Sequence, residues 1–210
     1  MFNGDKRTVR TNEVRLSYVH LNEPYANASQ PNNKPKYSVS MWIPKTDTAK
    51  MEEIRQAIRE AGAEAQSKVW GGLALPESLL MKIIHDGDGV NESGKPYGDE
   101  AKGCWVINAT ATIEKKPPVF RLNPTVGAVE ICPEAEIYSG MYAVVTVQFY
   151  GTKTGGNKMC CGLQAVVKTR DGDPLTGRTY GANDFADLLG AAAGATLPGQ
   201  QINPITGLPM

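Results

Sequence analysis

Several aromatic residues alternate with small polar residues along stretches whose period of two is typical of β-strands. Trp42 shares a predicted strand face with two serines, and Tyr142 and Tyr150 share one with a threonine and a glutamine. Exposed rings of this kind can stack on unpaired nucleobases, which contributes about 1–3 kcal/mol per base. The alternative is packing in the core or under loops, because aromatic residues are common in all strands. The pattern alone therefore predicts a small β-rich binding module whose ligand stays open.

No motif in the sequence predicts catalysis. His20 has no Ser or Cys placed nearby as a nucleophile, so we expect a structural or solvent-facing histidine. The run 86–89 (Asp-Gly-Asp-Gly) begins like a calcium loop, but Asn91 and Tyr97 stand where an EF-hand needs Gly and Glu. Residues 151–156 lack the Gly-Lys-Ser/Thr ending of a phosphate-binding loop and are predicted to form a hairpin turn. We expect no enzyme, no catalytic residue and no cofactor.

The four cysteines, at positions 104, 132, 160 and 161, and the two distant histidines match no zinc-binding spacing. We therefore expect reduced, partly buried thiols and no metal. The first residues are polar and lack the apolar core of a signal peptide. No apolar run approaches the roughly 20 residues of a membrane-spanning helix. The sequence predicts a soluble, intracellular protein without a membrane partner.

Charge argues against a nucleic-acid binder when only its sum is considered. Lys plus Arg and Asp plus Glu number 22 each, whereas a basic surface is the first mark of such proteins. The basic residues are concentrated in residues 1–20 and 150–180, and much of the acid lies at 47–64 and 86–100. A neutral sum is therefore compatible with a basic surface.

The periodicity predicts a mainly β fold. The expected strands lie at residues 8–21, 36–43, 104–113, 141–150 and 158–169, with a short extended piece at 119–122. Long polar loops are expected at 22–35 and 85–103. About five strands of this kind predict a small barrel.

Helical spacing of Met51, Ile54, Ile58, Ala61 and Ala65 predicts an amphipathic helix around residues 47–64, inserted between the second and third strands. A second short helix is expected at 76–84. From residue 181 the composition changes to Gly, Ala, Pro and Gln, which predicts a domain at 1–180 and a flexible tail at 181–210.

A series of short motifs carries a resemblance to a known family. They are LLMKIIHDGD (79–88), GCWVINA (103–109), PPV (117–119), IYSGMY (137–142), GLQAVVK (162–168) and RDGDPL (170–175). In this order and spacing they resemble a family of tailed-phage single-stranded-DNA-binding proteins that was long catalogued as a domain of unknown function. The resemblance covers residues 8–178. It implies an OB-fold barrel that coats single-stranded DNA during phage DNA replication or recombination, in the cytoplasm of the infected bacterial host.

The sequence departs from the standard OB-fold in one respect. Its helix is predicted between the second and third strands, whereas the standard fold has a helix between the third and fourth strands. With the resemblance, we expect DNA binding with little sequence preference, through rings and cations on one surface. The predicted stacking residues are Tyr18, Trp42, Trp105, Tyr142 and Tyr150, of which Trp105 is the one that the period of two places with the apolar residues. The predicted phosphate contacts are Arg10, Arg15, Lys115, Lys153, Lys158 and Lys168.

Two rival functions stay open at this point. A structural virion component, from the tail or the head decoration, would suit the long loops and the zero net charge. A nuclease on the same barrel would need a metal held by clustered carboxylates, for which residues 86–89 are the one candidate. The tail segment 183–189 could dock phage or host replication or recombination proteins, and self-association into a homo-oligomer is undecided.

Overall fold

The computed structural model describes residues 4–26, 34–91, 93–123, 125 and 127–175. By its internal contacts the chain divides into Met1–Leu175 and Thr176–Met210, and every element named below belongs to the first unit. The tail predicted at 181–210 and the boundary predicted at residue 180 lie outside the described residues.

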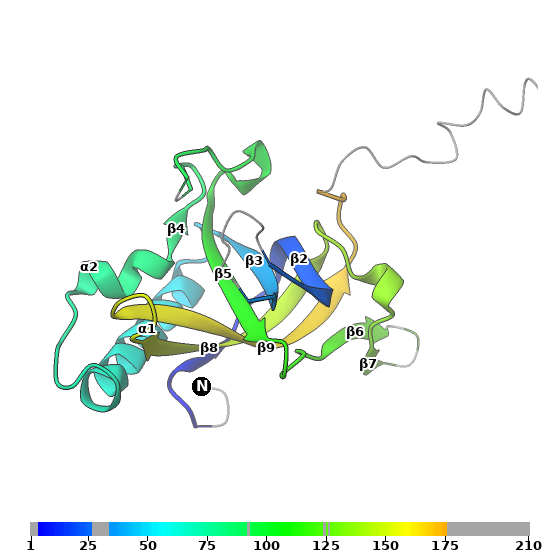
Figure 1. Cartoon of the computed structure of the whole chain (residues 1–210). Helices are drawn as coiled ribbons and strands as arrows, with labels where there is room; N and C mark the ends of the chain where they lie inside the picture. Colours follow the sequence, from blue (N-terminus) through cyan, green and yellow to red (C-terminus); the bar gives the residue numbers. More distant parts are fainter. Residues whose placement is uncertain (1–3, 27–33, 92, 124, 126, 176–210) are drawn as a thin grey trace, which may run out of the picture. The chain divides into compact units, whose positions relative to one another are not determined.

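Five strands close into a barrel (Figure 1). They are β2 (Val14–Tyr25), β3 (Lys36–Pro44), β5 (Cys104–Thr112), β8 (Tyr142–Thr152) and β9 (Lys158–Arg170). Around the barrel β2, β3, β5, β9 and β8 follow one another, and β8 pairs with β2 again. All these pairs are antiparallel except β5–β9, where Thr110 lies beside Gly162. This five-stranded ring is an OB-fold, as predicted.

Four short strands extend the barrel: β1 (Thr8–Arg10) on β8, β4 (His85–Asp86) on β5, β6 (Val119–Asn123) on β9, and β7 (Ala128–Ile131) on β6. The sequence predicted residues 8–21 as one strand, but the structure divides this stretch into β1 and β2. Thr11 lies at the division, where its Oγ1 accepts a hydrogen bond of 3.0 Å from the Val145 N–H. β4 lies inside the predicted loop 85–103, and the sequence analysis identified no strand at β7.

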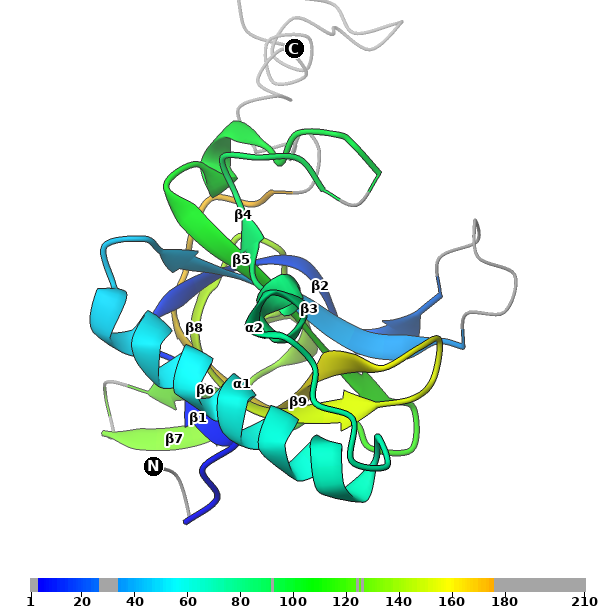
Figure 2. The same cartoon turned by 90° about the vertical axis from the view of Figure 1, so that its left-hand side faces the viewer.

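Helix α1 (Thr48–Lys68) lies across one end of the barrel (Figure 2). Asp47 caps it by accepting a hydrogen bond from the Lys50 N–H. The residues predicted for its buried face are all buried and join the barrel core: Met51, Ile54, Ile58, Ala61 and Ala65. Its predicted place between the second and third barrel strands is confirmed. The short helix predicted at 76–84 is α2 (Glu77–Leu80) followed by a 3₁₀ turn, Met81–Ile83.

Alternate residues of the barrel strands fill the core. On β3, Val39, Met41 and Ile43 are buried inside the barrel, as their period of two predicted. Phe149 and Ile107 meet them from β8 and β5. The residues between these positions point to the outside of the barrel, because successive side chains of a strand face opposite ways.

The loop from Gly87 to Gly103 folds over one end of the outer surface of β3 and β5. Lys45 fixes the start of this loop through two ion pairs. The Lys45 Nζ lies 2.5 Å from Asp86 Oδ1 and 2.6 Å from Asp88 Oδ2. The loop also approaches itself so closely at Gly87 that a Cβ there would lie 2.2 Å from the Ala101 carbonyl oxygen. The Asp-Gly-Asp-Gly run therefore builds a turn and an ion pair, as the turn interpretation predicted.

Among the described residues, no group of three or more His, Cys, Asp or Glu side chains is placed to hold a metal ion. Within the same ranges the model contains no helix with the length and hydropathy needed to span a bilayer. The four cysteines are free thiols.

Candidate nucleic-acid interface

Polar side chains, most of them small, occupy the outward positions of β2, β3 and β5, although Ser17 and Ser40 among them are buried. The strand registers place them in three rows, Ser17–Ser40–Asn108, His20–Ser38–Thr110 and Tyr25–Lys36–Thr112. These nine residues are called the polar sheet face below. The positions between these residues on each strand fill the barrel core. Successive side chains of a strand point to opposite faces, so the polar sheet face points away from the core.

The polar sheet face carries a stacked pair of rings. The His20 and Tyr25 ring centroids are 4.5 Å apart and the ring planes differ by 11°. Tyr25 is 53% exposed, so one side of its ring is available to a ligand. Burial lowers the pKa of His20, which keeps the imidazole neutral at neutral pH.

The sequence pattern does not predict this pair, for two reasons. Tyr25 fell in the stretch that was interpreted as a loop, whereas β2 continues to Tyr25. His20 was considered only as a catalytic or structural residue. A register shift between His20 and Tyr25 brings the two rings together, although they are five residues apart in the sequence. The period of two gives no signal for such a contact.

Tyr18, one of the predicted stacking residues, is exposed because of a bulge in β2. The sequence placed it on the face of Val14 and Leu16, which are buried, but Tyr18 is 71% exposed. The register of β2 shifts between Ser17 and His20, and Tyr18 has a φ of 47°, in the left-handed region that non-glycine residues rarely occupy. The bulge therefore turns the ring out of the barrel.

Tyr150 lies on the outer surface of β8, as its alternation with buried residues predicted. Strand β9 lies between β8 and β5, on the side of β5 that faces away from β3. Tyr150 pairs with Cys160 on β9 and is 42% exposed. Gly162 leaves room for its ring, because a Cβ at Gly162 would lie 3.3 Å from Tyr150 Cε1. Thr110 of the polar sheet face is the partner of Gly162 on the neighbouring strand.

The prediction that Trp42 is an exposed stacking ring is wrong. Trp42 does lie on the outer face of β3, but only 7% of it is exposed. It packs with Ala101 and Val106 in a small cluster under the loop 87–103. Trp105 is half-buried against the barrel core, with Lys45 Nζ 4.8 Å from its ring centroid, so it is also no free platform.

Two arginines of the chain itself lie against the ring of Tyr142. The Arg170 guanidinium carbon lies 3.3 Å from the Tyr142 ring centroid and that of Arg15 lies 5.9 Å away. Arg15 also donates a hydrogen bond of 2.9 Å to the Asp173 carbonyl. Tyr142 and Arg15, both predicted to contact DNA, are thus brought together, but at a place where residues 170–173 already engage them.

The prediction that Lys168 is a phosphate contact conflicts with its burial. Lys168 is 5% exposed, and its Nζ lies 2.8 Å from Asp171 Oδ1 and 3.0 Å from the Glu136 carbonyl oxygen. The pKa of Lys168 is raised because these acceptors favour its charged form more than burial opposes it. Lys168 therefore stabilises the end of β9.

Four other predicted cations are exposed. Lys153 and Lys158 flank the turn between β8 and β9, close in sequence to Tyr150. Lys115 is exposed and its Nζ lies 3.2 Å from Gln164 Oε1. Arg10 is exposed on β1, away from the polar sheet face.

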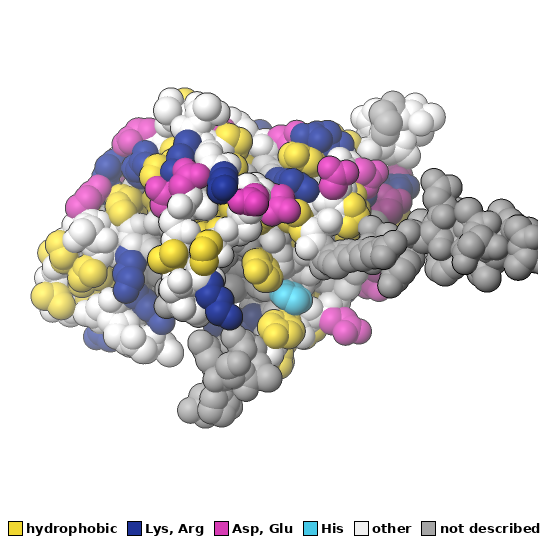
Figure 3. Space-filling model, turned by 90° about the horizontal axis from the view of Figure 1, so that it is seen from above, with side chains coloured by type: hydrophobic (Ala, Val, Ile, Leu, Met, Phe, Trp, Pro, Cys, Tyr) yellow, Lys and Arg dark blue, Asp and Glu magenta, His cyan; other side chains and the backbone are white. Residues whose placement is uncertain are grey.

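Several acidic side chains are neutralised by ion pairs within the chain. Glu13 pairs with Arg170, Asp171 with Lys168, and Asp86 with Lys45. Lys36 and Lys153 form no ion pair within the residues that the structure describes. On the face drawn in Figure 3, most acidic side chains lie in a band that also holds many Lys and Arg side chains, while hydrophobic side chains, a histidine and a few Lys or Arg side chains share another region.

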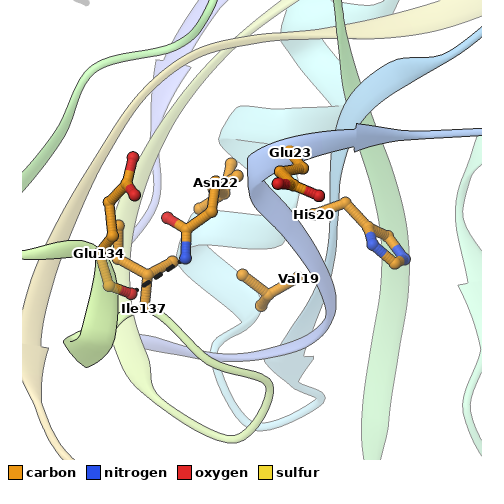
Figure 4. A pocket seen from close by; sticks show the side chains of 7 residues that line it. Val19, His20, Asn22, Glu23, Glu134 and Ile137 are labelled. Carbon is orange, nitrogen blue, oxygen red and sulfur yellow. Dashed lines mark hydrogen bonds between the residues drawn. The ribbon is translucent and has the colours of Figure 1, made fainter.

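A cavity of about 450 Å³ lies beside β2, and His20 is one of the residues that line it. Asn22, Glu23, Glu134 and Ile137 are among the residues that line it (Figure 4). Asn22 Nδ2 donates a hydrogen bond of 2.9 Å to the Glu134 carbonyl, and the ring of His20 points away from both. Two carboxylates make this cavity a poor site for a phosphate backbone.

The closed barrel and its polar, ring-bearing outer face define an OB-fold protein of the oligonucleotide-binding class. A family model described as "Enterobacter phage Enc34, ssDNA-binding protein" matches residues 7–195. The chain belongs to this family, as its motifs suggested.

Solved structures agree with the family. The single-stranded DNA-binding protein from bacteriophage Enc34 in complex with ssDNA has a TM-score of 0.63 and 27% identity, over 81% of this chain and 90% of that one. A C-terminal truncation of the Enc34 protein has a TM-score of 0.61 and 27% identity, over 80% and 89%. "Putative protein p50" of Acyrthosiphon pisum secondary endosymbiont phage 1 is 29% identical over 189 residues, 86% of this chain and 93% of that protein.

Proposed function

We propose that the chain binds single-stranded DNA across the polar sheet face, with little sequence preference and without catalysing a reaction. The observation that carries the proposal is the parallel ring pair of the half-buried His20 and the exposed Tyr25 on the barrel. Bases can stack on such a ring whatever their identity, because every base has a π-face.

The position of this face also supports the proposal. OB-folds bind oligonucleotides on the surface of their second and third strands and on the loops between strands one and two and between strands four and five. The corresponding strands here are β3 and β5, and the corresponding loops follow Tyr25 and Thr152. Tyr18 and Tyr25 lie on one side of this surface, and Tyr150, Lys153 and Lys158 belong to the other.

The revised set of contacts follows from exposure. We propose Tyr18, Tyr25 and Tyr150 for stacking, and Lys36, Lys115, Lys153 and Lys158 for phosphate contacts. Arg10, Arg15 and Tyr142 belong at most to the border of this surface, because they lie on β1 or are held by residues 170–173. Trp42, Trp105 and Lys168 are assigned to stability.

We further propose that the protein coats and protects single strands during phage DNA replication or recombination, in the cytoplasm of the infected bacterium. Membership of a phage single-stranded-DNA-binding family supports this role. Docking of replication or recombination proteins by residues 181–210 remains a proposal that a pull-down with and without this segment tests. The family does not support the rival of a virion component, since its model describes an ssDNA-binding protein.

A binding comparison tests the proposal. Fluorescence anisotropy should show tighter binding to a single-stranded oligonucleotide than to the same sequence as a duplex, and weaker binding as salt rises, because bound phosphates release counterions. The labelled strands should stay intact with magnesium. Equal affinity for duplex and single strand, indifference to salt, or degradation of the strand would each contradict the proposal.

A further inference from the structure

The last described residues, 171–175, lie against the outside of the barrel after the end of β9, where Figure 1 draws them in orange. They are called the strap below. The Leu175 N–H donates a hydrogen bond of 2.8 Å to the Ser139 carbonyl, and the Gly172 N–H donates one of 3.1 Å to the Tyr138 hydroxyl. The backbone of the strap is thus held at two points.

Two glycines let the strap lie closer to the barrel than other residues would allow. A Cβ at Gly140 would lie 2.1 Å from the Asp173 carbonyl oxygen. A Cβ at Gly172 would lie 2.3 Å from the Gly140 carbonyl oxygen and 2.7 Å from Tyr142 Cε2. Since glycine is the residue that permits such close backbone approach, the strap has a defined seat.

Arg15 lies against the strap with its hydrogen bonding incomplete. Its Nη2 donates a hydrogen bond of 2.9 Å to the Asp173 carbonyl, but its Nε is buried and has no hydrogen-bond partner. A buried donor of a charged group without an acceptor is unfavourable, because it has lost its water and gained nothing in return. The seated strap therefore satisfies only part of the guanidinium.

A phosphate group would complete the contacts of Arg15. Nε and Nη2 lie on one edge of the guanidinium plane and form a fork that binds two oxygens of a carboxylate or phosphate side by side. The single carbonyl oxygen of Asp173 engages one arm of this fork, and a neutral acceptor binds less strongly than a charged one. The exposed carboxylate of Asp173 would also be repelled by a phosphate, which favours departure of the strap.

Arg15 belongs to the row of outward positions next to the polar sheet face. It precedes Ser17 by two residues on β2, so both side chains lie on the same side of the strand. Its register partner is Trp42, and that of Ser17 is Ser40. Two residues of a strand span about 7 Å, so a DNA strand on the polar sheet face would lie within reach of Arg15.

We propose that single-stranded DNA displaces the strap, and that one of its phosphates takes the place of the Asp173 carbonyl on Arg15. The inference rests on the proposed function, because it concerns the same bound strand. Arg15 is covered in the free protein and becomes a contact in the complex. The seated strap therefore lowers the apparent affinity, because only the fraction of molecules with an open strap can form this contact.

Amide hydrogen exchange of the full chain, measured by NMR with and without a single-stranded thymidine oligonucleotide, tests the displacement. The Gly172 and Leu175 amides are hydrogen-bonded in the seated strap and should exchange faster in the complex, by about tenfold or more. The Val145 amide, bonded to Thr11 within the barrel, is the internal control and should not exchange faster. Fluorescence anisotropy of the same sample reports whether the oligonucleotide is bound. Binding with both strap amides still protected would overturn the strap proposal alone, whereas an absence of binding would overturn the proposed function as well.

Gly172→Ala tests the competition from the other side, because the added Cβ removes the strap from its seat and leaves Arg15 intact. This variant should bind the oligonucleotide severalfold more tightly than the wild type. Gly98→Ala is the matched control and should bind like the wild type, since its Cβ would meet only the flexible Glu100 side chain. Adding Arg15→Lys to Gly172→Ala should abolish the gain, because lysine keeps the charge but lacks the fork. Unchanged affinity of Gly172→Ala, or a gain that survives Arg15→Lys, would contradict the proposal.

Discussion

The imidazole of His20 lies parallel to the phenol ring of Tyr25, with 4.5 Å between the ring centroids. His20 thus supports one side of the tyrosine ring and leaves the other side open. A ring that is held before the ligand arrives loses less side-chain freedom on binding than a free one. We therefore propose that the pair is a rigid base-stacking platform on the polar sheet face.

Replacing Tyr25 by Ala should weaken binding of a single-stranded oligonucleotide roughly tenfold, because one stacked base contributes about 1–3 kcal/mol. The melting temperature should change little, since the ring is half exposed. Anisotropy titration and thermal unfolding give the two readouts. Leu79→Ala, at a residue exposed on α2, is the control and should bind like the wild type.

Replacing Tyr18 by Asn should preserve or raise stability and weaken DNA binding. Its left-handed backbone conformation costs about 1–3 kcal/mol for an ordinary residue, whereas Asn adopts it more readily. Tyr18→Asn should therefore unfold at an equal or higher denaturant concentration while binding DNA more weakly. A variant that binds as tightly as the wild type would remove Tyr18 from the interface.

Trp42→Ala should destabilise the fold by about 3–5 kcal/mol, as is typical of large buried rings. The reason is the cavity left beneath the loop 87–103, where Trp42 packs on Ala101 and Val106. Urea denaturation measures the loss. A fully stable variant with reduced DNA affinity would instead restore Trp42 as a stacking residue.

Lysine substitutions should separate phosphate contacts from structural cations. Each of Lys36→Ala, Lys115→Ala, Lys153→Ala and Lys158→Ala should reduce the slope of log affinity against log salt by about 0.7. Lys168→Ala should instead lower the melting temperature, because it leaves Asp171 without its 2.8 Å partner. If Lys168→Ala changed only the salt slope, its assignment to stability would be wrong.

Acid should destabilise the barrel partly through Asp5. Hydrogen bonds from the side chain and backbone of Arg7 hold the pKa of Asp5 well below its ordinary value. A carboxyl whose folded-state pKa is depressed stabilises the fold above its unfolded pKa of about 3.9, and this stabilisation is lost as the pH falls further. Melting temperatures measured from pH 7 downward should fall less steeply for Asp5→Asn than for the wild type. Equal slopes would show that the Asp5–Arg7 pair adds nothing to stability.

Much of the fold could be predicted from local pattern. The period of two located the five barrel strands, and the spacing of Met51, Ile54 and Ile58 located the buried face of α1. These predictions succeeded because a side chain's face in a regular strand or helix depends only on its position in the repeat. The period of two assigns Tyr18 to the wrong face because a bulge interrupts the repeat, and a bulge leaves no trace in the alternation of residue types.

The sequence by itself determined the barrel, the capping helix and, through its ordered motifs, the family. Only the tertiary structure decided which rings and cations are accessible. Trp42 is covered by a loop that begins more than forty residues later in the chain, and Lys168 pairs with Glu136 on a distant segment as well as with Asp171 three residues on. His20 and Tyr25 meet through a register shift. Accessibility depends on what the rest of the chain places over a residue, and a residue's own neighbours in sequence do not specify that.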